Sequence, residues 1–167
     1  MSGELQSFPR HAMQNSLTLF SRLPIATPFP IERLSQCLKM PCTDMADVDD
    51  EFWLCVSAVS DSGEMRLNWL RYTRNADRFS KLVARTLVRF EGVTTRYADQ
   101  KRTLLDHVEN TTATIGIVAD FDLNLSTVSG KAVLDLAREL EALVWNGEAF
   151  LDADGRQILR LDGESDF

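Results

Sequence analysis

Cysteine, histidine and long apolar runs are all scarce in this chain of 167 residues. The three cysteines, Cys37, Cys42 and Cys55, are few and odd in number, so they do not make a disulfide framework. Their spacing is also not that of a zinc knuckle or a redox CxxC motif. We therefore expect buried or incidental thiols in a reducing cytosol. No apolar run approaches the roughly 18 residues of a membrane-spanning helix, so we expect no membrane partner.

Basic residues are outnumbered by acidic ones. Lysine and arginine number 18 against 25 aspartates and glutamates, which gives a net charge of −7. This excess argues against nucleic acid or an anionic membrane as partner, and it suits a basic protein surface. The N-terminal sequence MSGELQSFPRHAMQNS has no basic start followed by an apolar core. It is therefore not predicted to be a secretory signal, and the expected compartment is the cytoplasm.

Motifs of catalysis are also missing. The chain contains no G-x-S-x-G, HExxH or CxxC pattern. Its two histidines, His11 and His107, lie far apart, and we expect His107 to be exposed on a helix. A pairing of His107 with a cysteine through the fold stays open, as does an enzyme with a noncontiguous site. We predict no catalytic residue, no cofactor and no metal ligand.

The stretch VADFDLNLSTVSGK, residues 118 to 131, invites a calcium interpretation. Polar side chains alternate there with the spacing of EF-hand ligands: Asp120, Asp122, Asn124 and Ser126. Counted from Asp120, the sixth position is Leu125, where the loop needs glycine. The twelfth is Lys131, where the loop needs a bidentate glutamate. We therefore predict a strand end followed by a loop whose polar side chains bond to their own backbone.

The end of the same stretch, Ser129-Gly130-Lys131, is similar to the end of a phosphate-binding P-loop. The first glycine of that motif is missing, and Ala132 stands where the magnesium-binding hydroxyl is needed. We predict instead that Ser129 or Thr127 caps a helix whose first turn contains Gly130. No nucleotide is expected to bind at Lys131.

Apolar periodicity and turn residues divide the chain into alternating elements. Strand patterns cover two ranges, 16–25 and 112–121. Helical patterns cover four ranges, 27–40, 75–90, 96–110 and 129–147, the last ending at Gly147. Hairpins are predicted from 51–60 with 64–72, and within 148–161 around the turn DADG. In the last helix, leucines are expected to face the sheet together with strand residues: Leu136, Leu140 and Leu143 with Val56, Ile117 and Val118.

This order predicts an α+β fold, with helices packed on a largely antiparallel sheet. The strand within 51–60 is expected to be central, because both of its faces are largely apolar. We assign a single domain to residues 16–161. It lies between a flexible N-terminal tail, 1–15, and an acidic C-terminal tail, 162–167, which we expect to be frayed.

Two features are candidates for binding a partner. The first is an acidic loop within 41–51 that contains no base; its acidic residues are Asp44, Asp47, Asp49, Asp50 and Glu51. This loop is either a solvated connection or a patch that docks on a cationic surface. The second feature is the pair Trp53 and Trp69. Strand tryptophans favour the core, but on an exposed sheet face these two would anchor an interface.

The second half of the chain resembles a group of known proteins. TATIGIVADFDL followed by LARELEALVWNGEAFLDADGRQIL is similar to the C-terminal part of small uncharacterised bacterial proteins. Some of these look like immunity proteins encoded beside polymorphic toxins. The resemblance covers about residues 110–160 and consists of an order of elements: strand, helix, NG, and a hairpin with DADGR.

This resemblance implies a soluble cytoplasmic domain without an active site of its own. Such a protein neutralises its cognate toxin by occupying the toxin's active site or by blocking its assembly. An acidic inhibitor complements the basic channels that nucleases and other toxins often have. The alternatives are a secretion chaperone or adaptor that holds a client, and the enzyme with a noncontiguous site.

Overall fold

A computed structural model describes residues 13–24, 26–46, 53, 55–71 and 76–167, without the side chains of 44–46. The helices are α1 (Ile31–Leu38), α2 (Ala76–Glu91), α3 (Ala98–Glu109) and α4 (Val128–Glu139). The strands are β1 (Ser16–Ser21), β2 (Cys42–Ala46), β3 (Cys55–Ser60), β4 (Gly63–Arg71), β5 (Ala113–Ala119), β6 (Ala142–Trp145), β7 (Ala149–Leu151) and β8 (Gln157–Arg160). The predicted α+β fold is confirmed. No helix in the described ranges is long and apolar enough to cross a membrane.

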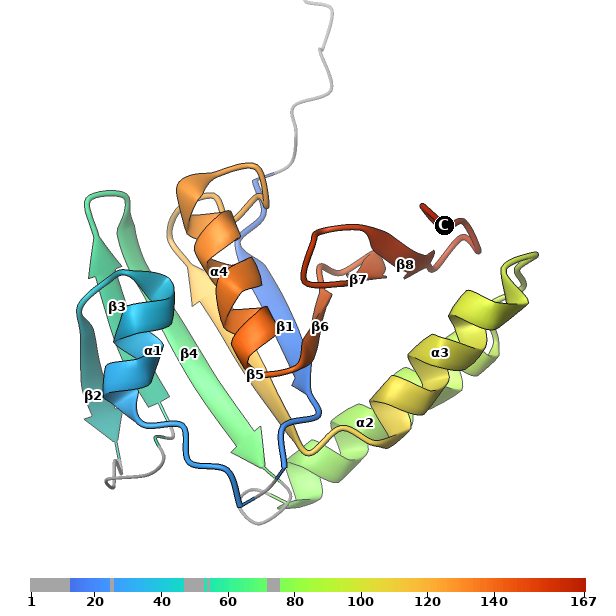
Figure 1. Cartoon of the computed structure of the whole chain (residues 1–167), viewed down its shortest axis with the longest axis horizontal. Helices are drawn as coiled ribbons and strands as arrows, with labels where there is room; N and C mark the ends of the chain where they lie inside the picture. The colour runs from blue at the N-terminus through green and yellow to red at the C-terminus, as the bar shows by residue number, and fades with distance from the viewer. Residues whose placement is uncertain (1–12, 25, 47–52, 54, 72–75) are drawn as a thin grey trace, which may run out of the picture.

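The strands form one eight-stranded sheet in the order β2-β3-β4-β5-β1-β6-β7-β8 (Figure 1). Every recorded pairing is antiparallel. The first strand of the chain, β1, lies between β5 and β6 and so joins the two halves of the sheet. Strand β3, which its sequence predicts to be central, has a neighbour on each side but lies second from the edge, and β5 lies between β4 and β1.

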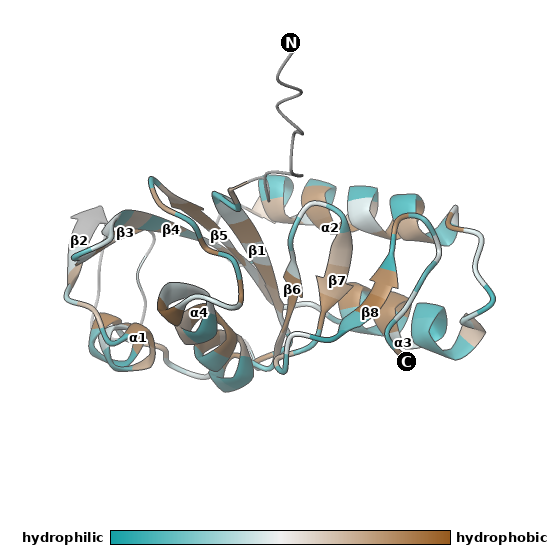
Figure 2. Ribbon diagram, turned by 90° about the horizontal axis from the view of Figure 1, so that it is seen from above, coloured by the Kyte–Doolittle hydropathy of each residue, from teal (hydrophilic) through white to brown (hydrophobic). Residues whose placement is uncertain are grey.

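One face of the sheet is covered by α1 and α4, which lie side by side (Figures 1 and 2). Alternation in β4 shows why, since Met65 and Leu67 are fully buried whereas Arg66 and Asn68 are exposed. The helices contribute residues at helical spacing to the same core: Leu34 and Leu38 from α1, and Val133, Leu136 and Ala137 from α4.

A second, aromatic core lies on the opposite face, at the end of the sheet formed by β1 and β6–β8. On β1, Phe20 belongs to this core, whereas its neighbour Leu19 belongs to the first one. Helix α2 contributes Phe90, and α3 contributes Leu104 and Val108. Helices α2 and α3 cover this end, and no helix among the described residues covers most of the same face of β3, β4 and β5 (Figure 2).

Two element predictions are wrong. A strand, β2, occupies part of the predicted acidic loop, because its backbone pairs with β3 despite a sequence without apolar alternation. The last helix ends at Glu139 rather than Gly147, and Glu141 takes a left-handed backbone angle of φ 50°. The following Ala-Leu-Val-Trp becomes β6, so Leu143 faces the second core instead of the α4 side.

The prediction for Val118 is also wrong. Its side chain is 56% exposed, whereas that of Ile117 is fully buried. Adjacent residues of a strand point to opposite faces, so the two cannot both face α4. The other members of the predicted contact set, Val56, Leu136 and Leu140, lie in the first core with Ile117.

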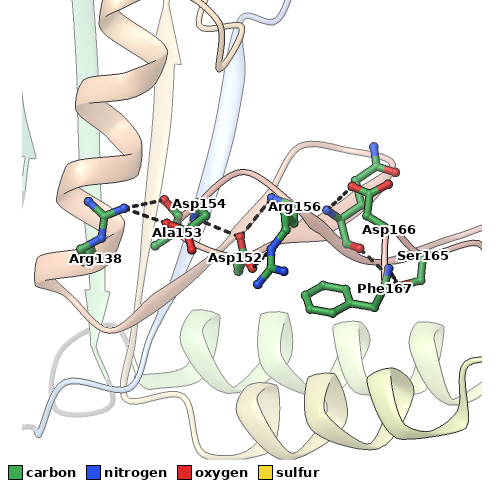
Figure 3. Close-up of polar contacts among 9 residues, drawn as sticks. Arg138, Asp152, Ala153, Asp154, Arg156, Ser165, Asp166 and Phe167 are labelled. Carbon is green, nitrogen blue, oxygen red and sulfur yellow. Dashed lines mark hydrogen bonds and ion pairs between the residues drawn. The ribbon is translucent and has the colours of Figure 1, made fainter.

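Residues 162–167 fold back onto β8 and are not frayed (Figure 3). The Gln157 N–H donates to Asp166 Oδ2 at 2.7 Å, and the Asp166 N–H donates to Gln157 O at 2.9 Å. The guanidinium of Arg156 lies 4.5 Å from the centroid of the Phe167 ring. These contacts cover part of the last strand of the sheet, which would otherwise offer unpaired backbone groups to another chain.

Candidate functional site

Most of the predicted acidic patch lies outside the described residues: Asp47, Asp49, Asp50 and Glu51. Asp44 belongs to β2, where its backbone lies opposite Val56 of β3. Because β2 is the first strand in the sheet order, the acidic connection leads from an edge strand to an interior one.

The tryptophans Trp53 and Trp69 both lie in the first core. Their side chains are 1% and 4% exposed, and their ring centroids are 5.0 Å apart. Phe29 contacts Trp69 edge to face at 6.2 Å. Neither indole therefore offers a surface to a partner, and the alternative in which they anchor an interface does not fit their burial. The core location favoured for strand tryptophans is what the structure shows.

The polar residues of 120–126 bond to the backbone. Asp120 Oδ1 accepts from the Glu64 N–H at 3.0 Å. Asp122 Oδ1 accepts from the N–H groups of Gln14 and Asn124, both at 3.0 Å. These carboxylates thus fix the ends of β4, β5 and the chain before β1, as the loop interpretation predicts. Among the described residues, no group of His, Cys, Asp and Glu is arranged to hold a metal ion.

Helix α4 begins as predicted, with Thr127 as its cap. Thr127 Oγ1 accepts from the Gly130 N–H at 3.0 Å. A Cβ at Gly130 would lie 2.1 Å from the carbonyl oxygen of Asn124 and 2.6 Å from its carbon. The glycine is therefore required by close packing of the helix against the β5–α4 loop.

We expect Gly130→Ala to lower the free energy of unfolding by about 1–3 kcal/mol, because the added methyl overlaps backbone atoms. Lys131→Ala should change it by no more than about 0.5 kcal/mol, since Lys131 is exposed. Urea denaturation of both variants measures the difference. A larger loss for Lys131→Ala than for Gly130→Ala would contradict this interpretation of the Ser-Gly-Lys sequence.

His107 is buried, so the prediction of an exposed histidine is wrong. Only 8% of it is exposed, and its Nε2 lies 2.7 Å from the carbonyl oxygen of Phe20. Burial lowers the pKa of His107, although the hydrogen bond to Phe20 opposes the shift. The spacing of Leu104, His107 and Val108 places all three on one helix face, which is the signal that indicates burial. The imidazole ties α3 to β1.

All three cysteines lie in the described ranges, where no disulfide joins them, and all are partly buried. Burial raises the pKa of the Cys37 thiol, and the charge of Glu139 raises it further. Burial also raises the pKa of Cys42. A raised pKa leaves less thiolate near neutral pH, so these two thiols are poor nucleophiles.

The sequence DADGR forms a hairpin turn, as predicted (Figure 3). Asp152 Oδ1 accepts from the N–H groups of Asp154 and Arg156, at 2.9 and 3.0 Å. Asp154 binds Arg138 of α4 at 3.1 Å, which fastens the turn to the helix. These acidic groups therefore have structural partners.

Within the described ranges, no helix covers most of the sheet face opposite α1 and α4 along β3, β4 and β5. A groove of about 480 Å³ lies on it, where α2 runs beside the sheet. Its floor is one row of residues across the strands, in the paired order Thr18, Gly116, Asn68 and Cys55. Arg78 and Leu82 of α2 form the wall.

Sequence reasoning did not identify this groove. Two signals are visible in the sequence, namely a glycine in the middle of a predicted strand and a run of basic residues at helical spacing. The glycine and the basic residues lie close together because of the sheet order, which places β1 beside β5, and because of the position of α2.

The chain matches no family model, no curated protein and no solved structure at a significant level. The similarity of residues 110–160 to immunity proteins therefore remains an expectation, and the candidate surfaces rest on the chain's own residues.

Proposed function

We propose that this chain is a non-enzymatic binding protein, and specifically an immunity protein that neutralises a cognate bacterial toxin by direct contact. The observation that carries this proposal is the acidic connection between β2 and β3. Asp44 lies in β2, Asp47, Asp49, Asp50 and Glu51 follow it, and residues 44–51 include no base. Such a segment is complementary to a basic channel or surface on a toxin.

The two ends of this connection support a role in binding. At one end, β2 is hydrogen-bonded to β3. At the other end, Trp53 is buried against Trp69 in the first core. In the sequence, the acidic residues therefore lie between an edge strand and a side chain that is packed in the core. A segment fixed at both ends loses less conformational entropy on binding than a free tail does.

The chemistry of the titratable groups also favours binding over catalysis. His107 is occupied by a contact with Phe20, and Asp120, Asp122 and Asp152 accept backbone hydrogen bonds. These groups hold the fold together. The chain carries a net charge of −7, which is available for recognition. Acidic residues are concentrated locally in the acidic connection.

The test is co-expression with the product of the adjacent gene, followed by size-exclusion chromatography. The wild-type chain should form a stable one-to-one complex and protect cells from that product. Replacing Asp47, Asp49 and Asp50 by lysine changes the net charge from −7 to −1, since each substitution adds two units. This variant should associate more slowly, with a weaker salt dependence, and should protect less well.

A matched control separates the position of the charges from their sum. Replacing the exposed residues Asp99, Glu109 and Glu148 by lysine gives the same net charge on other elements. We expect this control to bind nearly as the wild type does. If the adjacent gene product does not bind at all, the immunity function is excluded. If both triple variants bind equally well, the acidic connection is not the interface.

A further inference from the structure

Helix α2 carries a basic stripe in a chain that is acidic overall. Four cations recur every three or four residues and so share one helix face: Arg78, Lys81, Arg85 and Arg89. Lys81 pairs with Asp77 at 3.0 Å, and Arg89 lies 5.4 Å from the centroid of the Trp145 ring. Within the described residues, Arg78 and Arg85 form no ion pair.

The stripe runs beside the uncovered face of the sheet. Arg78 and Leu82 line the groove directly. Trp145, which Arg89 contacts, lies next to Thr18 in the strand register and thus extends the row of floor residues. Among the described residues that line the groove, Arg78 is the one ionised side chain, and it gives this part of the surface a positive charge. A cavity at the start of α4 contrasts with it, because Lys39 and Lys131 there are offset by Asp61 and Asp135.

Gly116 opens the floor of this groove. It lies in the middle of β5, between Thr18 of β1 and Asn68 of β4. A Cβ built at Gly116 would meet no atom within 4 Å, and its backbone angle is not left-handed. Neither packing nor conformation therefore requires glycine here, although glycine weakens a strand. A glycine inside a strand often occurs at a bulge, at a bend or where a ligand or another backbone comes close, and the pairings of β5 with β1 and β4 contain no bulge.

The floor also offers polar groups suited to a peptide. Thr18 lines the groove and is partly exposed, and within the described residues its hydroxyl has no hydrogen-bond partner. Asn68 is exposed, and its side-chain amide forms no hydrogen bond within the same described residues. A hydroxyl and an amide can satisfy the backbone and side-chain polar groups of a bound segment.

We propose that this groove binds an acidic peptide segment of a partner protein, with Arg78 and Arg85 contacting its carboxylates. Guanidinium groups bind carboxylates through two parallel hydrogen bonds. The described residues give the groove a helix wall on one side, so it would leave a small molecule exposed. Beyond its floor, the exposed side chains of Val59 and Val118 continue the same face and supply apolar contact for a protein.

This inference goes beyond the proposed function and does not use the acidic connection. The groove is lined by residues of β1, β3, β4, β5 and α2, whereas the acidic residues belong to the stretch 44–51. A test on the groove can therefore fail while the immunity proposal stands, and the reverse also holds. The Asp47, Asp49 and Asp50 triple lysine variant should bind an acidic peptide at least as well as the wild type does.

The test is a fluorescence-anisotropy titration of the full chain with labelled octaglutamate at low salt. Wild-type protein should bind, and affinity should fall as salt rises. Arg78→Glu with Arg85→Glu should weaken binding by about tenfold or more, because repulsion replaces attraction. The control Arg96→Glu with Arg102→Glu makes the same charge change near α3 and should weaken binding much less.

Gly116→Val tests the groove without any change of charge. Valine should fill the floor and weaken octaglutamate binding by about tenfold, since contact at the groove is blocked. The same substitution should raise the midpoint of thermal unfolding, because valine suits a strand better than glycine does. Unchanged affinity in Gly116→Val would mean that only surface charge holds the peptide, and it would overturn the proposal. Absence of binding by the wild type at low salt, or tighter binding of oligothymidylate than of octaglutamate, would also overturn it.

Discussion

Phe150→Ala should lower the free energy of unfolding by about 3–5 kcal/mol, the cost of removing a fully buried aromatic ring. The side chain has no exposed area and occupies the centre of the second core. Its ring centroid lies 5.0 Å from that of Phe20, 5.1 Å from that of Trp145 and 5.2 Å from that of Phe90. The substitution therefore removes contacts with β1, β6 and α2 together.

Urea denaturation followed by circular dichroism measures this loss. The control is Val88→Ala on α2, because Val88 is 70% exposed and should change the free energy by no more than about 0.5 kcal/mol. A loss below about 1 kcal/mol for Phe150→Ala would show that the face covered by α2 and α3 is not a packed core. The positions of the groove wall and of the basic stripe would then be in question as well.

The elements that sequence reasoning identified are those whose pattern is set by burial on one side. In β4, Met65, Leu67 and Trp69 alternate with Arg66 and Asn68, and the buried and exposed faces follow that alternation. In α2, apolar residues at three and four positions mark the covered face. Local pattern suffices there, because each residue meets either the core or solvent.

The predictions were wrong where one local sequence pattern is compatible with more than one structure. Leu143 continues the apolar spacing of α4, yet it belongs to β6, because Glu141 turns the chain and the sheet accepts another strand. The short strand β2 has no apolar alternation and forms through pairing with β3. Such outcomes depend on partners that are distant in sequence, and tertiary pairing overrides local propensity.

The two candidate surfaces also differ in whether the sequence alone predicts them. The acidic connection is visible in the sequence, because charge needs no fold to be counted. The groove needs the sheet order, since Thr18, Gly116 and Asn68 come from three strands that are distant along the chain. The burial of Trp69 was readable from its alternation with Asn68 and Leu70, whereas that of Trp53 follows from its contact with Trp69.

Leu140→Ala tests the packing of the first core at the C-terminal end of α4. Leu140 follows the last residue of α4, and its side chain has no exposed area. Its backbone has independent partners, since its N–H donates to Leu136 O at 3.0 Å and its carbonyl accepts from Ser21 Oγ at 2.6 Å. Alanine keeps these bonds, so the substitution isolates the side chain.

We expect Leu140→Ala to cost about 2–5 kcal/mol in unfolding free energy, from lost burial and from the cavity left between α4 and the sheet. Leu140→Met, which nearly conserves volume, should cost less than about 1.5 kcal/mol. Val128→Ala serves as the exposed control on the same helix, since Val128 is 87% exposed. Equal losses for the alanine and methionine variants would mean that polarity or backbone strain, and not packed volume, stabilises this turn. A loss near zero for alanine would mean that the end of α4 does not pack on β1 and β6, and the covering of this face by α4 would have to be abandoned.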